Sequence, residues 1–126
     1  MTKEEIARSK LYVALDVDST EKALMYAEKL SSLVGGFKVG LELNEIMREE
    51  LLVADLAVAF KNFVDQRKLF EIIGQGLFLD MKFHDIQNTV VGAIKPVVRR
   101  RVKMFTLHAS AGIDVMQSAV AHALKD

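Results

Sequence analysis

The feature that most restricts the fold is a regular alternation of short β-rich runs and longer amphipathic stretches. Four apolar runs rich in Val, Leu and Phe are each followed by a segment with apolar residues at helical spacing. The expected strands are 11–17, 36–43, 77–81 and 102–108. Because a helical stretch separates each strand from the next, the pattern predicts βαβ units and a parallel sheet.

The helical stretches carry recognisable start and stop signals. Asp18 and Glu21 fit a capping-box-like start, and Gly74 ends the longest stretch. Pro96 falls inside the third stretch, where it is expected to kink the helix or to sit near a broken turn. The expected helices are 21–34, 45–73, 88–100 and 112–124.

The length of the chain limits how many such units it can hold. A complete (βα)8 barrel needs roughly 200 residues or more, and the sequence has 126. Four βα units therefore predict one α/β domain over residues 1–126 that is half of a TIM (βα)8 barrel. A small open α/β sheet is the alternative. A half-barrel leaves two strand edges bare, which favours completion by self-association, and we expect a homodimer.

Composition excludes several classes of protein. Lys plus Arg and Asp plus Glu are both 17, so no basic excess indicates a nucleic-acid partner. The basic run at 99–103 is interpreted as a solvated helix end. Cysteine is absent, the first ten residues lack an apolar signal core, and no window is apolar enough for a membrane span. The expectation is a cytoplasmic protein with no membrane partner.

Charged residues gather where the predicted strands end. Asp16 ends the first strand, Lys38 lies in the second, and Asp80 and Lys82 end the third. Since ligands of parallel α/β sheets bind at the carboxyl ends of strands, these groups are expected to converge in one pocket. Side chains two apart on a strand share a face, so Asp80 and Lys82 point the same way, as do Thr106 and His108.

Such a cluster can perform decarboxylation without a metal or an organic cofactor. An ammonium held between carboxylates can deliver a proton to a developing carbanion. A fixed carboxylate would also repel a substrate carboxylate, and loss of carbon dioxide would relieve that repulsion. The alternative is a structural ion-pair network, although buried ion pairs are costly when they serve stability alone.

Four segments resemble one known family. "VALDVDS", "FKVGLEL", "LFLDMKFHDIQNTV" and "TLHASAG", in this order, are similar to the N-terminal half of orotidine 5'-monophosphate decarboxylase. The most specific part is the D-x-K-x-x-D core formed by Asp80, Lys82 and Asp85, with a following Asn-Thr. The resemblance covers most of the chain except roughly residues 44–73.

The resemblance implies a cofactor-free, cytoplasmic enzyme of pyrimidine nucleotide synthesis that acts on a nucleotide. Lys38 and Asp80 would join the catalytic charge network, with Lys82 as the proton donor to C6 of the base. Asp16 would contact the ribose. Asp85 would enter the neighbouring subunit's site across a dimer interface, and Thr89 would help line that shared site.

Three departures from the family pattern stand out. Gln87 occupies a position where the family usually has Pro, which removes a φ constraint from the loop presenting Asp85. The segment after "GLEL" is longer by roughly 15 residues and needs cover on more than one side. The family's phosphate-binding elements follow strands seven and eight of the barrel, so binding energy that assists the chemical step is expected to be lost.

The turn "HASAG" is a candidate anion site. Backbone N–H groups near Ser110 and Gly112 could hold a phosphate at the start of the last helix, and a plain N-cap by Ser110 is the simpler interpretation. His84 and His122 are expected at the surface. His108 is expected to satisfy a backbone partner, and no metal site is expected.

Two functions from different classes remain open. The first is an orotidine 5'-monophosphate decarboxylase whose activity is weak or absent without its phosphate-binding half. The second is a non-catalytic half-barrel, a natural fragment or an engineered scaffold, that self-associates. A magnesium-dependent sugar-phosphate decarboxylase of the same superfamily is a lesser rival, because "FHDIQNT" is closer to the orotidine version.

Overall fold

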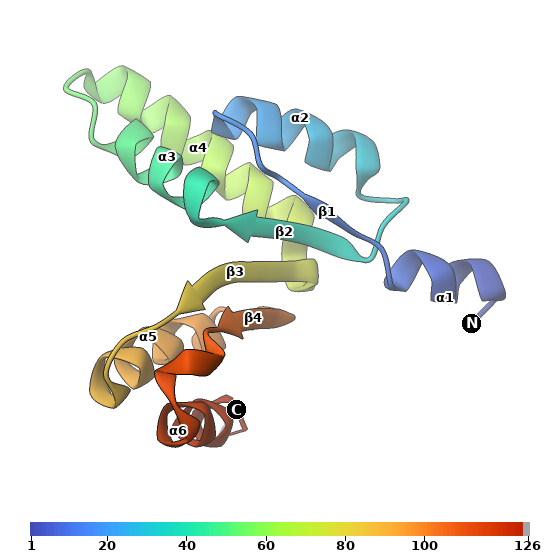
Figure 1. Cartoon of the computed structure of the whole chain (residues 1–126). Coiled ribbons are helices and arrows are strands. Elements are labelled where there is room, and N and C mark those ends of the chain that lie inside the picture. The colour runs from blue at the N-terminus through green and yellow to red at the C-terminus, as the bar shows by residue number, and fades with distance from the viewer. Residues whose placement is uncertain (125–126) are drawn as a thin grey trace.

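A computed structural model describes residues 1–124 and has four parallel strands in the sheet order β1-β2-β3-β4 (Figure 1). The strands are β1 (Tyr12–Ala14), β2 (Gly36–Gly40), β3 (Leu77–Phe83) and β4 (Met104–Leu107). The helices are α1 (Lys3–Ser9), α2 (Thr20–Leu30), α3 (Leu41–Leu51), α4 (Leu56–Ile73), α5 (Gln87–Arg99) and α6 (Ile113–Ala123). Two short 3-10 turns, Gly74–Gly76 and Ala109–Ala111, precede β3 and α6. The predicted α/β half-barrel arrangement of four βα units is confirmed.

Helices α2 to α6 pack on one face of the sheet (Figure 1). Along β2, Phe37 and Val39 enter the apolar core, whereas Lys38 between them points to the other face. The same alternation continues in the neighbouring strands, where Leu15, Leu77 and Leu79 belong to the same core. A second cluster joins α5 and α6 to the end of β4. The opposite face of the sheet therefore remains available for polar side chains.

The predicted second strand and second helix are wrong in their bounds. The strand ends at Gly40, and a helix begins at Leu41, because Leu43 and Met47 are buried at helical spacing. The single helix expected over 45–73 is two helices, α3 and α4. Asp55 separates them, since its carboxylate accepts hydrogen bonds from the first turn of α4.

The predicted start of the helix after β1 is also wrong, and an additional helix precedes β1. Ser19, and not Asp18, caps α2, because the Ser19 hydroxyl accepts the backbone N–H of Lys22. Asp18 instead pairs with the Lys22 ammonium at 2.7 Å. Helix α1, which sequence periodicity did not indicate, begins with a capping box between Thr2 and Glu5 and projects away from the sheet (Figure 1).

Pro96 lies in the final turn of α5, and the helix ends three residues later at Arg99. The helix continues through Pro96, so the expected broken turn is absent at this position. Gly74, at φ 55°, ends α4 as predicted, because a left-handed residue there terminates the helical hydrogen bonding.

Glu50 joins three helices through one partly buried carboxylate. Its oxygens accept the backbone N–H of Thr20 at 3.0 Å and the Thr20 hydroxyl, at the start of α2. From α4, Gln66 donates to the same carboxylate at 3.4 Å and to the Met47 carbonyl at 2.8 Å. Asn62 donates to the Glu50 carbonyl at 2.8 Å. The long segment after β2 is thereby fixed to the loop that follows β1.

Candidate active site

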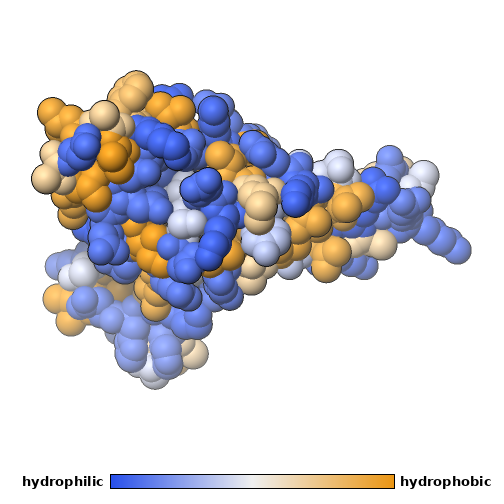
Figure 2. All heavy atoms as spheres, turned by 90° about the horizontal axis from the view of Figure 1, so that it is seen from above, coloured by the Kyte–Doolittle hydropathy of each residue, from blue (hydrophilic) through white to orange (hydrophobic). Residues whose placement is uncertain are grey.

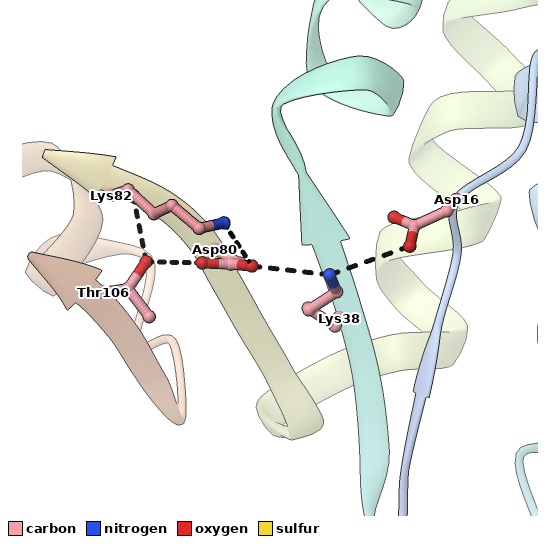
Figure 3. Close-up of polar contacts among 5 residues, drawn as sticks. All are labelled: Asp16, Lys38, Asp80, Lys82 and Thr106. Atoms are coloured by element: carbon pink, nitrogen blue, oxygen red, sulfur yellow. Dashed lines mark hydrogen bonds and ion pairs between the residues drawn. The ribbon is translucent and has the colours of Figure 1, made fainter.

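Five polar side chains form a continuous chain of contacts on the face of the sheet that the helices leave open (Figure 3). The Lys38 side chain of β2 lies between two carboxylates. Its Nζ is 3.7 Å from Asp16 Oδ2 and 3.4 Å from Asp80 Oδ2. Lys82 Nζ lies 2.9 Å from the same Asp80 oxygen. The parallel register places Gly40 beside Asp80, so no side chain of β2 intervenes between Lys38 and that carboxylate.

Asp80 is the centre of this chain. It is only 8% exposed and receives hydrogen bonds from Thr106 Oγ1 at 2.6 Å, Lys82 Nζ at 2.9 Å and Lys38 Nζ at 3.4 Å. The Thr106 hydroxyl and then the Lys82 ammonium lower the pKa of Asp80 to about 2, against the effect of burial. The group is therefore a carboxylate at neutral pH.

Lys82 has an unusual backbone. Its φ is 49°, a left-handed value that a residue with a long side chain rarely adopts, and the β3–β4 register shifts between Leu79 and Phe83. The Lys82 backbone N–H donates to Thr106 Oγ1 at 2.9 Å. Its side chain is 59% exposed, so the ammonium reaches the open face while it stays tied to Asp80. Strained residues of this kind concentrate at functional sites.

Thr106 is a site residue that the prediction did not include. It lies on β4, donates to Asp80 and accepts from the Lys82 backbone, so it contacts both members of the D-x-K pair. Its place on the same face as these residues follows from strand alternation. What the sequence could not indicate is the register shift that brings the Lys82 N–H to its hydroxyl.

The structure brings together four of the predicted site residues, Asp16, Lys38, Asp80 and Lys82. Asp85 and Thr89 lie apart, at the start of α5. Asp85 Oδ1 accepts the backbone N–H of Ile86 at 2.7 Å, and within residues 1–124 it forms no ion pair with the cluster. Thr89 is exposed on the first turn of α5.

The predicted anion turn has a different arrangement from the one expected. Ser110 does not cap α6; the N-cap is Gly112, at φ 105° and without a side-chain hydrogen bond. The Ser110 hydroxyl lies 2.5 Å from His108 Nδ1, and that nitrogen also accepts the Ser110 backbone N–H, as expected for His108. The His108 ring stacks on His84 at 4.6 Å between centroids.

The three histidines are distributed between surface and partly buried positions. His84 is exposed, as predicted, whereas His122 is half-buried and its Nδ1 lies 2.8 Å from the Ser118 carbonyl oxygen. Among residues 1–124, no three His, Asp or Glu side chains are grouped as metal ligands. None of the helices in the described part of the chain has the length and apolar character needed to span a membrane.

Comparison with known proteins assigns the chain to one family. A sequence model described as the Orotidine 5'-phosphate decarboxylase / HUMPS family matches residues 9–126. The orotidine 5'-phosphate decarboxylases of Heliobacterium modesticaldum and Carboxydothermus hydrogenoformans are each 40% identical, over 116 and 111 residues. Those matches cover 90% and 87% of this chain but only 41% and 40% of the relatives. The chain thus spans about two fifths of the length of these proteins.

Solved structures agree on the fold. Orotidine 5'-phosphate decarboxylase from Lactobacillus acidophilus superposes with a TM-score of 0.60 at 27% identity, over 90% of this chain and 46% of that one. The enzyme from Pyrococcus horikoshii OT3 gives a TM-score of 0.65 at 21% identity, over 88% and 47%. The four βα units therefore correspond to about half of a TIM barrel of this type.

Proposed function

The chain belongs to the Orotidine 5'-phosphate decarboxylase / HUMPS family, and we propose that its 126 residues form one domain carrying the proton-delivering part of an orotidine 5'-monophosphate decarboxylase site. The observation that carries this proposal is the chain of contacts from Asp16 through Lys38 and Asp80 to Lys82. Family membership alone would leave open whether the charged residues come together.

In the proposed reaction, the bond between C6 of the pyrimidine and its carboxylate carbon breaks, and carbon dioxide leaves. The electron pair that remains on C6 takes a proton from the Lys82 ammonium, which yields uridine 5'-monophosphate and a neutral amine that water reprotonates. Asp80, ionised and fixed by three donors, would hold that ammonium in place and repel the substrate carboxylate.

The remaining assignments complete the proposed site. Asp16, whose side chain is 55% exposed at the end of the network, would accept hydrogen bonds from ribose hydroxyls. Asp85 and Thr89 lie apart from the network of their own chain, and in the proposal they serve the site of a second subunit in a homodimer. The reaction as proposed is cofactor-free and takes place in the cytoplasm.

We expect low turnover from residues 1–126 alone. The Lys82 and Asp16 side chains are more than half exposed, so water competes with the substrate for their charges. The family's phosphate-binding elements belong to the part of the relatives that lies beyond this match, and phosphate contacts supply binding energy to the chemical step. Ser110 and Gly112 remain a proposed substitute anion site.

The test is the loss of orotidine 5'-monophosphate absorbance with the purified 126-residue chain. Lys82→Ala should abolish any turnover, whereas Lys95→Ala, which changes an exposed lysine on α5, should not. The assay should be repeated with the separately produced C-terminal part of the Heliobacterium modesticaldum relative. Turnover that rises on addition and depends on Lys82 supports the proposal, and equal background in all samples contradicts it.

The second candidate is a non-catalytic half-barrel, a natural fragment or an engineered scaffold, that self-associates. The exposure of Lys82 supports it, because a structural ion pair can persist on a surface without chemistry. It predicts that the wild-type and Lys82→Ala chains assemble equally well and show the same background under every condition of the assay.

A further inference from the structure

We propose that a hollow at the N-terminal ends of β3 and β4 binds a nucleotide through its chain of phosphates. The hollow has a volume of about 1190 Å³ and lies between the end of α5, the start of β4 and the end of α6. Among the residues that the structure describes, its lining includes the cations Arg99, Arg101 and Lys103 and no carboxylate. This basic hollow is at the opposite end of the sheet from the strand end that carries Lys82 (Figure 1).

The three cations of the basic hollow have no charged partner within residues 1–124. The ion pairs of this part of the chain all involve other side chains. Arg100, which belongs to the same basic run, faces a different element, since its guanidinium lies 5.2 Å from the centroid of the Phe70 ring on α4. Arg99, Arg101 and Lys103 are exposed, so their charges remain available to a ligand.

Backbone hydrogen bonds fix the segment that carries these charges. Helix α5 ends at Arg99, and the Arg101 N–H then donates to the Val98 carbonyl at 2.9 Å. Arg101 has a left-handed φ of 53°, and the Lys103 N–H donates to the Leu77 carbonyl at the start of β3, at 2.8 Å. Arg101 and Lys103 therefore lie beyond the solvated helix end that the basic run suggested, on a turn held between α5 and β3.

Charge at this end of the molecule favours an anion with several negative charges. Two helices, α5 and α6, end beside the basic hollow, and a helix C-terminus carries the equivalent of about half a negative charge. Three side-chain cations exceed the two helix ends together, which leaves roughly two positive charges. Guanidinium groups bind phosphate oxygens in pairs through their planar N–H fork, so a phosphate chain suits Arg99 and Arg101.

The remaining lining of the basic hollow suits an organic ring. Val98, Val102 and Phe105 are partly buried apolar residues beside the cations, and the Gln75 amide can both donate and accept hydrogen bonds. Ligand sites typically combine an apolar lining with a few polar groups that fix the orientation of the ligand. A nucleobase against the apolar residues, with its phosphates on the cations, uses both parts of this lining.

The first experiment is isothermal titration calorimetry of the 126-residue chain with ATP, at low salt and without magnesium. We expect one ATP per chain, and Arg101→Gln combined with Lys103→Gln should weaken binding roughly tenfold or more. Arg99→Gln, which leaves the turn after α5 unchanged, should weaken it as well. Lys29→Gln combined with Lys68→Gln removes the same charge from α2 and α4, on the side of the molecule seen in Figure 2, and should have little effect.

The second experiment separates the basic hollow from the proposed active site and from a nucleic-acid surface. Lys82→Ala should bind ATP as tightly as the wild-type chain does. Inorganic triphosphate should compete with ATP, whereas adenosine should not, because the cations hold the phosphate chain. Circular dichroism should show that all variants are folded, since the side chains replaced in them are exposed.

Four results would overturn the proposal. They are the absence of ATP binding, equal weakening in the two double variants, loss of binding in Lys82→Ala, and competition by adenosine as strong as that by triphosphate. A single-stranded RNA oligonucleotide that binds more tightly than ATP would also overturn it, because the cations would then belong to a nucleic-acid surface.

Discussion

The backbone N–H of Lys82 donates to the hydroxyl of Thr106 across the β3–β4 register shift, at 2.9 Å. The same hydroxyl donates to Asp80 at 2.6 Å, so one threonine satisfies a displaced backbone group and orients the carboxylate that holds the Lys82 ammonium. This relationship links a local backbone distortion to the geometry of the proposed proton donor.

Thr106→Val should disrupt that geometry while it conserves the shape of the side chain. Removing the hydroxyl leaves the Lys82 N–H and one Asp80 oxygen without their partner, which we expect to lower the free energy of unfolding by about 1–3 kcal/mol. The pKa of Asp80 should rise, because its strongest hydrogen bond is lost. Carbon-13 NMR titration of the carboxyl measures the pKa, and Thr106→Ser should retain both properties.

Asp80 should make stability depend on pH in the acid range. Its pKa is about 2 in the folded chain, against an ordinary value of 3.8, so its contribution is fully present above about pH 4 and is lost as pH falls toward 2. The contribution is on the order of 2 kcal/mol. Urea unfolding at pH 7, 4 and 3 should show this loss for wild type, and Asp80→Asn should largely remove the dependence.

Asp18→Asn is the control for the acid titration. Hydrogen bonding to Lys22 lowers the pKa of Asp18 as well, but this pair lies on the surface, where solvent screens it. A loss of acid sensitivity in Asp18→Asn as large as that in Asp80→Asn would argue against Asp80 as the dominant group.

Gly36→Ala should be strongly destabilising because two backbones meet there. A Cβ at this position would lie 2.0 Å from the Gly76 carbonyl oxygen and 2.5 Å from the Tyr12 ring. The Gly76 backbone could relieve this overlap only by moving, which would disturb the start of β3. We expect a loss of several kcal/mol in thermal or urea unfolding, as for other overpacked sites. Gly92→Ala, on α5 with open space around it, should instead stabilise the chain by about 1 kcal/mol.

Glu50→Ala should loosen α2 from α3 and α4. It removes the acceptor of the Thr20 backbone N–H and of Gln66, and we expect a loss of about 2–3 kcal/mol with faster hydrogen exchange at the Thr20 amide. Glu49→Ala, at the exposed neighbouring position, is the matched change. Equal effects of the two replacements would argue against the hydrogen bonds of the partly buried Glu50 carboxylate as the cause of the loss.

Much of the fold could be predicted because burial on one sheet face leaves a regular pattern. Strand alternation around Lys38 and helical spacing at Ala23 and Ala27 indicated the βα order and the face that carries the charges. The spacing of Asp80 and Lys82 likewise indicated that they would meet. These features depend on local periodicity, which a sequence displays directly.

The remainder depended on interactions between distant segments. "GLEL" alternates like a strand, yet Leu43 packs with Met47 as a helix does, and only the core decides between the two. The left-handed φ of Lys82 has no sequence signal, because it is imposed by the register shift against β4 and stabilised by Thr106. The role of Glu50 was equally hidden, since its partners Thr20 and Gln66 lie 30 and 16 positions away.

The Glu50 carboxylate also limits how the segment after β2 can change in evolution or in the laboratory. Thr20 begins the helix that follows the Asp16 loop, so that loop is anchored by a residue of α3, in the segment between β2 and β3. A deletion in this segment that includes Glu50 would remove the anchor. A shortened chain that keeps Asp16 beside Lys38 must therefore provide a new acceptor for the Thr20 amide at the same time as the deletion.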